Sequence, residues 1–219
     1  MNKKRDYIQE IIDKKERLSK RSDRYEQFTK RVIPIVSGFR AIKSLDAKIP
    51  FRNEQLKYCP IGYIACVEGY FRLLIRDLID NNEICRDNVI KFKDIKFGTT
   101  EILAFHYNKV TIGEFISHLL PIRNIKDINS NISTLIDNDF LHLLKSKPLK
   151  EYNNEKTLFD IFPSFITDVE EFYRLRHIYA HELAIREKVK VKTIENSMGM
   201  TGLFVIETES LINDLFIGV

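Results

Sequence analysis

The stretch Ile61-Gly-Tyr-Ile-Ala-Cys-Val-Glu-Gly-Tyr-Phe-Arg-Leu-Leu-Ile-Arg-Asp-Leu-Ile79 decides the fold class. Its apolar residues recur three or four positions apart, the spacing of one face of an α-helix; they are Ile64, Val67, Phe71, Leu74, Ile75 and Leu78. Cys59-Pro60 precedes the stretch and Asn81-Asn82 follows it, and both pairs are typical of helix ends. The sequence therefore predicts a long buried helix from 61 to 79.

The rest of the chain is also predicted to be helical. Only 8 Gly and 6 Pro occur in 219 residues, which favours long helices with short connections. Thr111 and Glu114 have the spacing of a capping box, and the polar segment Lys147–Lys156 predicts a loop. Apolar spacing and capping signals together predict further helices over 4–31, 32–48, 99–107, 111–120, 128–145 and 163–188.

These elements predict one all-α domain over residues 1–219, a helical bundle of four to five core helices. Its parts are an N-terminal helical extension (1–50), a core (55–188) and a C-terminal cap (189–219). The extension is highly charged with an incomplete apolar stripe, so we expect it to dock on the body rather than form a free coiled coil. For the cap, the sequence allows either a short strand or a last helix, and Met198–Gly202 is predicted to be a flexible joint.

Composition limits the class of protein. Apolar residues make up 44% and charged residues 30%, which describes a soluble globular chain; the net charge of +4 suits a polyanionic partner without indicating one. We find no secretory signal, and no apolar run of the about 20 residues that span a bilayer. Cys59, Cys66 and Cys85 lack metal-like spacing and favour free thiols in a reducing cytosol. We therefore expect a cytoplasmic protein.

Groups suited to catalysis gather in Arg176–Glu182, which reads Arg-His-Ile-Tyr-Ala-His-Glu. The segment is predicted to lie in the middle of a mostly apolar helix, where polar groups seldom occur without a partner or a role. His exchanges a proton near neutral pH, and Arg binds anions with a planar fork of donors. The combination suggests chemistry on a phosphate.

RNA offers a reaction that fits these groups. Its 2′-OH attacks the adjacent phosphate and expels the 5′-oxygen, leaving a 2′,3′-cyclic phosphate. The step needs a base, an acid and positive charge on the phosphorane oxygens, which His and Arg supply without a metal or other cofactor. Two copies around a two-fold axis would double the groups in one cleft.

A helical projection leaves the pairing within the motif open. At about 100° per residue, Glu170, Arg174, His177 and His181 share one stripe. Arg176 lies off this stripe, so it would need its long side chain, a helix distortion or a second subunit to act with His181. The projection therefore gives two Arg–His groupings, one through Arg174 and one through Arg176.

The segment Arg176-His177-(three residues)-His181 resembles the R-polar-x(4–6)-H signature of HEPN domains in its shortest form. Its setting, a late helix ending in an Ala-His-Glu run, is also similar. The helix Cys66–Arg76 resembles the first core helix of these proteins, with Glu68 in the place of a polar residue often found there. The likeness covers about 55–186.

This resemblance implies a homodimeric bundle whose two motifs meet in a metal-independent endoribonuclease cleft. Many HEPN proteins are toxins of toxin–antitoxin systems or act in abortive infection and antiviral defence, which implies an antitoxin or defence-system partner. Arg176 and His181 would be the catalytic pair with His177 between them. Glu68 and Glu182 would be supporting residues, with Glu68 orienting the Arg. RNA-backbone contacts are expected from residues that flank the motif region: Arg72, Arg76, Arg174 and Arg186.

Several plainer interpretations stay open. Buried His residues are mostly satisfied core groups, and Glu68 with Arg176 could be a structural ion pair. His177 and His181 before Glu182 could suggest zinc, but a zincin has its Glu between the two His residues. The main alternative to the enzyme is a non-catalytic nucleic-acid-binding or protein-interaction subunit of a defence complex.

Overall fold

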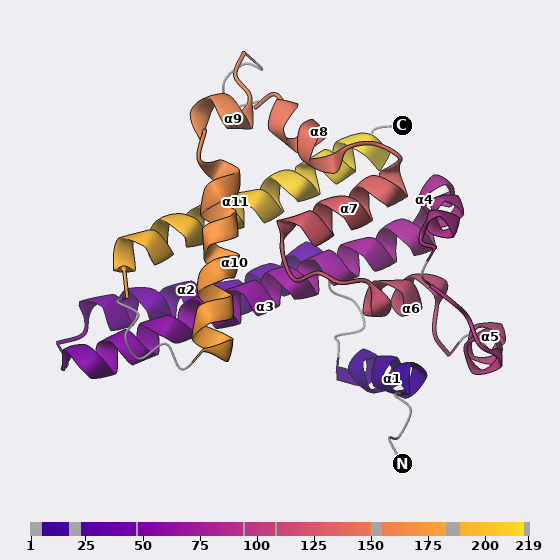
Figure 1. Ribbon diagram of the computed structural model, residues 1–219, viewed down its shortest axis with the longest axis horizontal. Coiled ribbons are helices and arrows are strands. Elements are labelled where there is room, and N and C mark those ends of the chain that lie inside the picture. Colours follow the sequence, from indigo (N-terminus) through magenta and orange to yellow (C-terminus); the bar gives the residue numbers. More distant parts are fainter. Residues whose placement is uncertain are drawn as a thin grey trace.

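The described residues form an all-α structure, which confirms the predicted class. The computed structural model describes eleven α-helices and one 3-10 helix, with no strand in any described segment (Figure 1). The described residues are 6–17, 23–46, 48–93, 95–107, 109–149, 155–182 and 189–216.

Helix α3 (Ile49–Asn81) is the spine of the molecule, and it is longer than predicted. It starts at Ile49 and runs through Pro60, so the prediction that Cys59-Pro60 opens the helix is wrong. A proline inside a helix removes one backbone hydrogen bond and costs about 3 kcal/mol. Burial of Leu56, Cys59 and Pro60 itself offsets that cost, because α2 packs along this part of α3.

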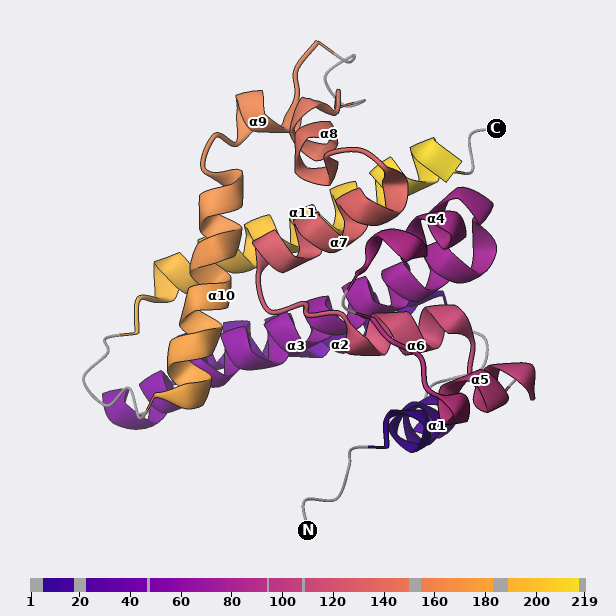
Figure 2. The same ribbon diagram turned by 45° about the vertical axis from the view of Figure 1, so that its right-hand side comes forward.

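The predicted 4–31 helix is two elements. They are α1 (Tyr7–Arg17) and α2 (Arg24–Ser44), and Asp23 is the N-cap of α2. Helix α2 continues past Pro34. Helix α2 lies beside α3, whereas α1 packs against α6 and buries Ile8 and Ile11 (Figure 2). The N-terminal extension therefore docks on the body as predicted, but as two helices on different parts of it.

The middle of the chain holds short helices. They are α4 (Glu83–Asp87), η1 (Asn88–Lys91), α5 (Thr99–His106), α6 (Ile112–Leu119), α7 (Ile125–Ile136), α8 (Phe140–Ser146) and α9 (Leu158–Ile161). The capping box of α6 is confirmed: Glu114 N–H donates to Thr111 Oγ1 (3.0 Å), and Thr111 N–H donates to Glu114 Oε2 (2.9 Å). The predicted 128–145 helix is wrong, because Asp137 takes a left-handed conformation (φ 55°) and Asp139 caps a new helix.

Helix α11 (Val191–Phe216) is part of the core rather than a cap, and it packs against α10 (Phe165–His181) and α3 (Figure 1). Its Met198–Gly202 segment is helical, so the predicted flexible joint is wrong. Gly202 permits a close approach to α3: a Cβ there would lie 2.9 Å from the Tyr63 hydroxyl. Thr201 and Thr208 can be buried because their hydroxyls donate to carbonyls of their own helix.

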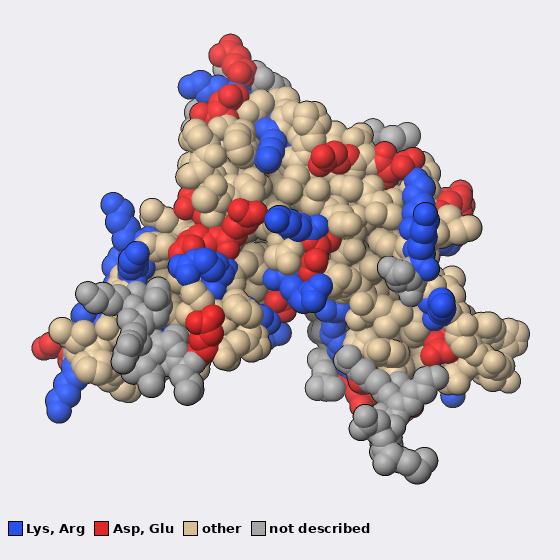
Figure 3. Space-filling view, in the orientation of Figure 1, with Lys and Arg blue, Asp and Glu red and all other residues tan. Residues whose placement is uncertain are grey.

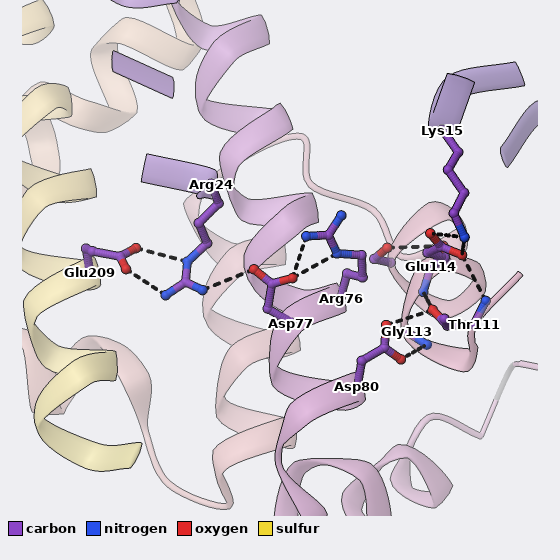
Figure 4. Close-up of polar contacts among 10 residues, drawn as sticks. Lys15, Arg24, Arg76, Asp77, Asp80, Thr111, Gly113, Glu114 and Glu209 are labelled. Carbon is purple, nitrogen blue, oxygen red and sulfur yellow. Dashed lines mark hydrogen bonds and ion pairs between the residues drawn. The ribbon is translucent and has the colours of Figure 1, made fainter. Parts of the chain in front are cut away.

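One polar cluster ties α2, α3 and α11 together (Figure 4). Arg24 Nε and Nη2 donate to the two carboxylate oxygens of Glu209 at 3.0 and 2.7 Å. Its Nη1 donates to Asp77 Oδ2 at 3.1 Å, and the Tyr70 hydroxyl donates to Glu209 at 2.7 Å. These bonds fix the relative positions of three long helices at a place where apolar packing alone would allow sliding.

Burial also accounts for the three cysteines. Cys59, Cys66 and Cys85 are buried free thiols, as predicted, and burial raises the pKa of Cys59 to about 12 and that of Cys85 to about 11. Such thiols are unreactive at neutral pH. None of the described helices combines the length and the apolar character needed to cross a membrane.

Candidate functional site

The motif lies at the C-terminal end of α10, not in the middle of a longer helix. Helix α10 ends at His181, and Glu182 is its C-cap, with its N–H donating to Ile178 O (3.0 Å). His177, His181 and Glu182 are exposed. The predicted helix is confirmed as far as His181, and the rest of its predicted length falls mainly on residues 183–188, among them Arg186, which lie outside the described residues.

Arg176 and His181 contact each other within one chain. The Arg176 Nη1 atom lies 3.3 Å from His181 Nε2, although five residues on an ideal helix put two side chains about 140° apart. Of the routes left open by the sequence, the structure therefore shows the reach of the long Arg176 side chain, without a second subunit. The helix ends at His181, so no following turn intervenes, and the long Arg side chain can reach the imidazole.

The contact also constrains the imidazole. A guanidinium has only N–H donors, so a hydrogen bond in this contact runs from Arg176 to His181 Nε2, and it forms only in the tautomer that carries its proton on Nδ1. An unprotonated Nε2 is the form of His that can take up a proton. The structure thus presents a base and a fixed cation side by side at the protein surface.

Glu68 holds Arg176 from the other side. Its Oε1 lies 3.4 Å from Arg176 Nη2, and the two side chains are 24% and 28% exposed. Burial raises the pKa of the Glu68 carboxyl, and the nearby Arg176 and Arg72 charges oppose this shift. The structure therefore brings Glu68 and Arg176 together, an arrangement that suits both an orienting role and a structural ion pair.

His177 belongs to the same surface as His181. The two ring centroids are 5.2 Å apart with an interplanar angle of 50°. Within the described residues, no three His, Cys, Asp or Glu side chains form a group that could hold a metal ion. His177 can therefore support the imidazole of His181 by packing, whichever role His181 has.

The residues of the alternative grouping through Arg174 line a different hollow of the surface. Glu170, Arg174 and His177 line it together with the 123–126 segment, and His181 is not among its lining residues. Arg174 is bound by its neighbour on the helix, since Nε and Nη2 donate to the two Glu171 oxygens at 2.6 and 2.7 Å. These bonds lower the Glu171 pKa. The geometry favours the grouping through Arg176.

Arg72 and Arg76, predicted to contact RNA, lie along α3 rather than around His181. Arg72 Nη1 donates to the Ser117 and His118 carbonyls at the end of α6. Arg76 Nε and Nη2 donate to Asp77 Oδ1 at 2.8 and 2.6 Å. Both arginines line a pocket between α1, α3 and α6.

Tyr173 is a residue near the site that the sequence analysis missed, and it lines the hollow beside Glu170, Arg174 and His177. It is 5% exposed, and its hydroxyl has no hydrogen-bond partner among the described residues. Burial raises its pKa, the Glu68 charge adds to this shift, and the Arg176 charge opposes it. A buried hydroxyl without a partner is uncommon in folded proteins. The signal in the sequence was its place three residues before Arg176, on the same helix face.

Comparisons of the chain with models of protein families, with curated proteins and with solved structures found no match. The resemblance of the motif to HEPN domains therefore stays a prediction. The geometry brings an imidazole, a guanidinium and a carboxylate together in that order, with the imidazole exposed to solvent.

Proposed function

We propose that this chain is a metal-independent endoribonuclease of the HEPN type, acting in the cytoplasm in a toxin–antitoxin or antiviral defence system. The observation that carries the proposal is the 3.3 Å contact between Arg176 Nη1 and His181 Nε2 at the exposed end of α10. The motif spacing suggested this pair, and the geometry supplies the base and the cation that the reaction requires.

In the proposed reaction, RNA enters with its scissile phosphate against Arg176. The Arg176 guanidinium turns from His181 Nε2 to the phosphate, which frees the Nε2 lone pair. His181 Nε2 then takes the proton of the 2′-OH, the 2′-oxygen bonds to phosphorus, and the bond from phosphorus to the 5′-oxygen breaks. Arg176 stabilises the charge on the phosphorane oxygens, held in place by Glu68. The products are a 2′,3′-cyclic phosphate and a 5′-hydroxyl.

The leaving 5′-oxygen needs a proton, and one neutral imidazole cannot both take a proton and give another in the same step. A second copy related by a two-fold axis would supply a protonated His181 as the acid. The exposure of His177 and His181 leaves this end of α10 available for such a dimer. An antitoxin or another defence-system protein would be the further partner.

The test compares purified wild type with His181→Ala on tRNA and total RNA, with and without EDTA. Wild type should cleave in both conditions and leave cyclic phosphate ends, and His181→Ala should lose at least about 100-fold in rate. His142→Ala is the matched control, because His142 is an exposed His on α8, outside the motif. Equal cleavage by wild type and His181→Ala would refute the proposed role of His181.

The Glu68–Arg176 ion pair also supports the alternative function, in which the motif is structural and the chain is a non-catalytic binding or interaction subunit. On this alternative, wild type leaves every RNA intact while still binding nucleic acid or a partner protein. Growth on expression separates the two functions in cells. Wild type and His181→Ala should differ in toxicity only if the chain is an enzyme.

A further inference from the structure

A second cluster of positive charge lies where α1 meets the body. The polar residues that line the pocket between α1, α3 and α6 are Lys14, Lys15, Arg72, Arg76, Glu114, Ser117 and His118. Figure 3 shows a notch at its lower centre, and in Figure 1 α3 runs there between α1 and the end of α10. Lys and Arg side chains line the upper edge of this notch (Figure 3).

Most charges around the pocket have partners. Lys15 pairs with Glu114 at 3.0 Å, and His118 Nε2 lies 2.9 Å from Glu10. Arg76 uses Nε and Nη2 on Asp77, and Figure 4 shows it between Asp77 and the Lys15–Glu114 pair. These contacts give Glu114, Asp77 and Glu10 partners other than Lys14.

Lys14 is the exception. Its ammonium group has no hydrogen bond or ion pair with any described residue, although it shares the pocket with Arg72 and Arg76. Burial lowers its pKa to about 8, and the charges of Arg72 and then Arg76 add to this shift. Lys14, Arg72 and Arg76 thus face one pocket whose lining carboxylate, Glu114, is paired with Lys15, an arrangement that a bound anion would stabilise.

The pocket lies close to the motif along α3. Glu68, Arg72 and Arg76 follow one another at four-residue steps and therefore share a helix face. Arg76 lies about 12 Å along the helix from Glu68, which contacts Arg176. A single strand with one phosphate at Arg176 would carry other phosphates past the pocket.

We propose that the Lys14–Arg72–Arg76 pocket binds a backbone phosphate of the RNA substrate and so positions the strand for cleavage at Arg176 and His181. This proposal rests on the proposed function for the identity of the ligand. It assigns a binding role to α1, which lies outside the part of the chain that resembles HEPN domains.

The test measures binding separately from cleavage. The probe is a fluorescent 2′-O-methyl RNA strand, which lacks the attacking hydroxyl, titrated by anisotropy over a range of salt concentrations. Lys14→Gln should bind about fivefold more weakly at about 0.1 M salt, and its slope of log affinity against log salt should be smaller by about 0.7. The control is Lys91→Gln on η1, which removes an equal charge from the exposed ion pair between Lys91 and Asp137. This variant should bind like wild type.

A second measurement does not depend on a variant. The Lys14 pKa in wild type, followed by NMR of labelled lysine, should rise when the 2′-O-methyl strand is added, because a phosphate stabilises the ammonium form. An unchanged Lys14 pKa, or equal affinity and salt slope in wild type and Lys14→Gln, would overturn the phosphate site. Cleavage of ordinary RNA is scored separately: binding through Lys14 without any cleavage would overturn the proposed function and leave the site standing.

Discussion

Replacing Arg176 by Met separates a catalytic role from a structural one. The change keeps an unbranched apolar stem and removes the guanidinium, so packing around the stem is disturbed little. It breaks two contacts, one to Glu68 Oε1 at 3.4 Å and one to His181 Nε2 at 3.3 Å. If Arg176 is catalytic, activity should fall far more than stability.

The expected loss of stability is small because the pair is only partly buried. With Arg176 and Glu68 28% and 24% exposed, water can reach the carboxylate that is left behind, and its raised pKa lets it take up a proton more readily. We expect a loss of about 1 kcal/mol, between a surface and a buried ion pair. For a chain of 219 residues this lowers the Tm by about 2–4 °C.

The expected loss of activity is much larger. Removing one donor that stabilises a transition-state oxyanion costs about 10²–10³ in rate. The assay combines urea unfolding with single-turnover cleavage of a fluorescent RNA. The double variant Arg176→Met with Glu68→Gln should recover the lost stability and none of the activity, because it removes the unpaired carboxylate without restoring the cation.

Two results would refute this reasoning. A stability loss above about 3 kcal/mol would make Arg176 a structural residue, because only a deeply buried pair costs that much to break. Cleavage within about twofold of wild type would show that the guanidinium does not contact the phosphate in the transition state.

The remaining predictions concern the fold and the α1 pocket. Arg24→Met should lower the free energy of unfolding by about 3 kcal/mol, since it leaves Glu209 and Asp77 without their shared cation; a further Glu209→Gln change should restore part of it, and additive effects in urea unfolding would contradict the cluster. Lys14 should make wild type gain stability from about pH 8 to 10.5, because the unfolded chain then binds the proton that the folded Lys14 has lost. Lys14→Gln should lack this gain. Urea unfolding that shows the same pH dependence of stability in wild type and Lys14→Gln would contradict the lowered Lys14 pKa.

Helix content could be predicted from the sequence because apolar spacing and capping are local signals. The six apolar positions of α3 and the Thr111–Glu114 box needed no knowledge of the fold. The helix start at Cys59-Pro60 was predicted wrongly, since Pro60 lies inside α3. Packing between α2 and α3 outweighs the lost hydrogen bonds, and packing is a property of the whole chain.

The prediction for the C-terminal segment failed for a related reason. Gly199 and Gly202 resemble a joint in isolation, but Gly202 faces the Tyr63 hydroxyl and allows α11 to approach α3. Likewise, the left-handed conformation of Asp137 separates α7 from α8, although the helical spacing of apolar residues continues from one helix into the next. Tertiary contacts and one backbone conformation decided both cases, and neither leaves a strong periodic signal.

The sequence identified the residues of the candidate site but did not predict how they contact one another. Arg176, His181 and Glu68 were singled out from the motif, whereas their contacts depend on where α10 ends and how it crosses α3. Lys14 could not have been singled out. It sits in a charged segment of ordinary appearance, and only the docking of α1 places it beside Arg72 and Arg76.

The Arg24–Glu209 bond has a consequence for the timing of folding during synthesis. Its two residues are 185 positions apart, so at about 5–20 residues per second the ribosome needs roughly 10–40 s after Arg24 to make Glu209. During that interval α2 and α3 have no α11 to cover them, and Phe71, which packs on Phe204 in the finished fold, lacks this contact. A nascent chain of this kind exposes apolar surface for many seconds, which is when chaperones bind.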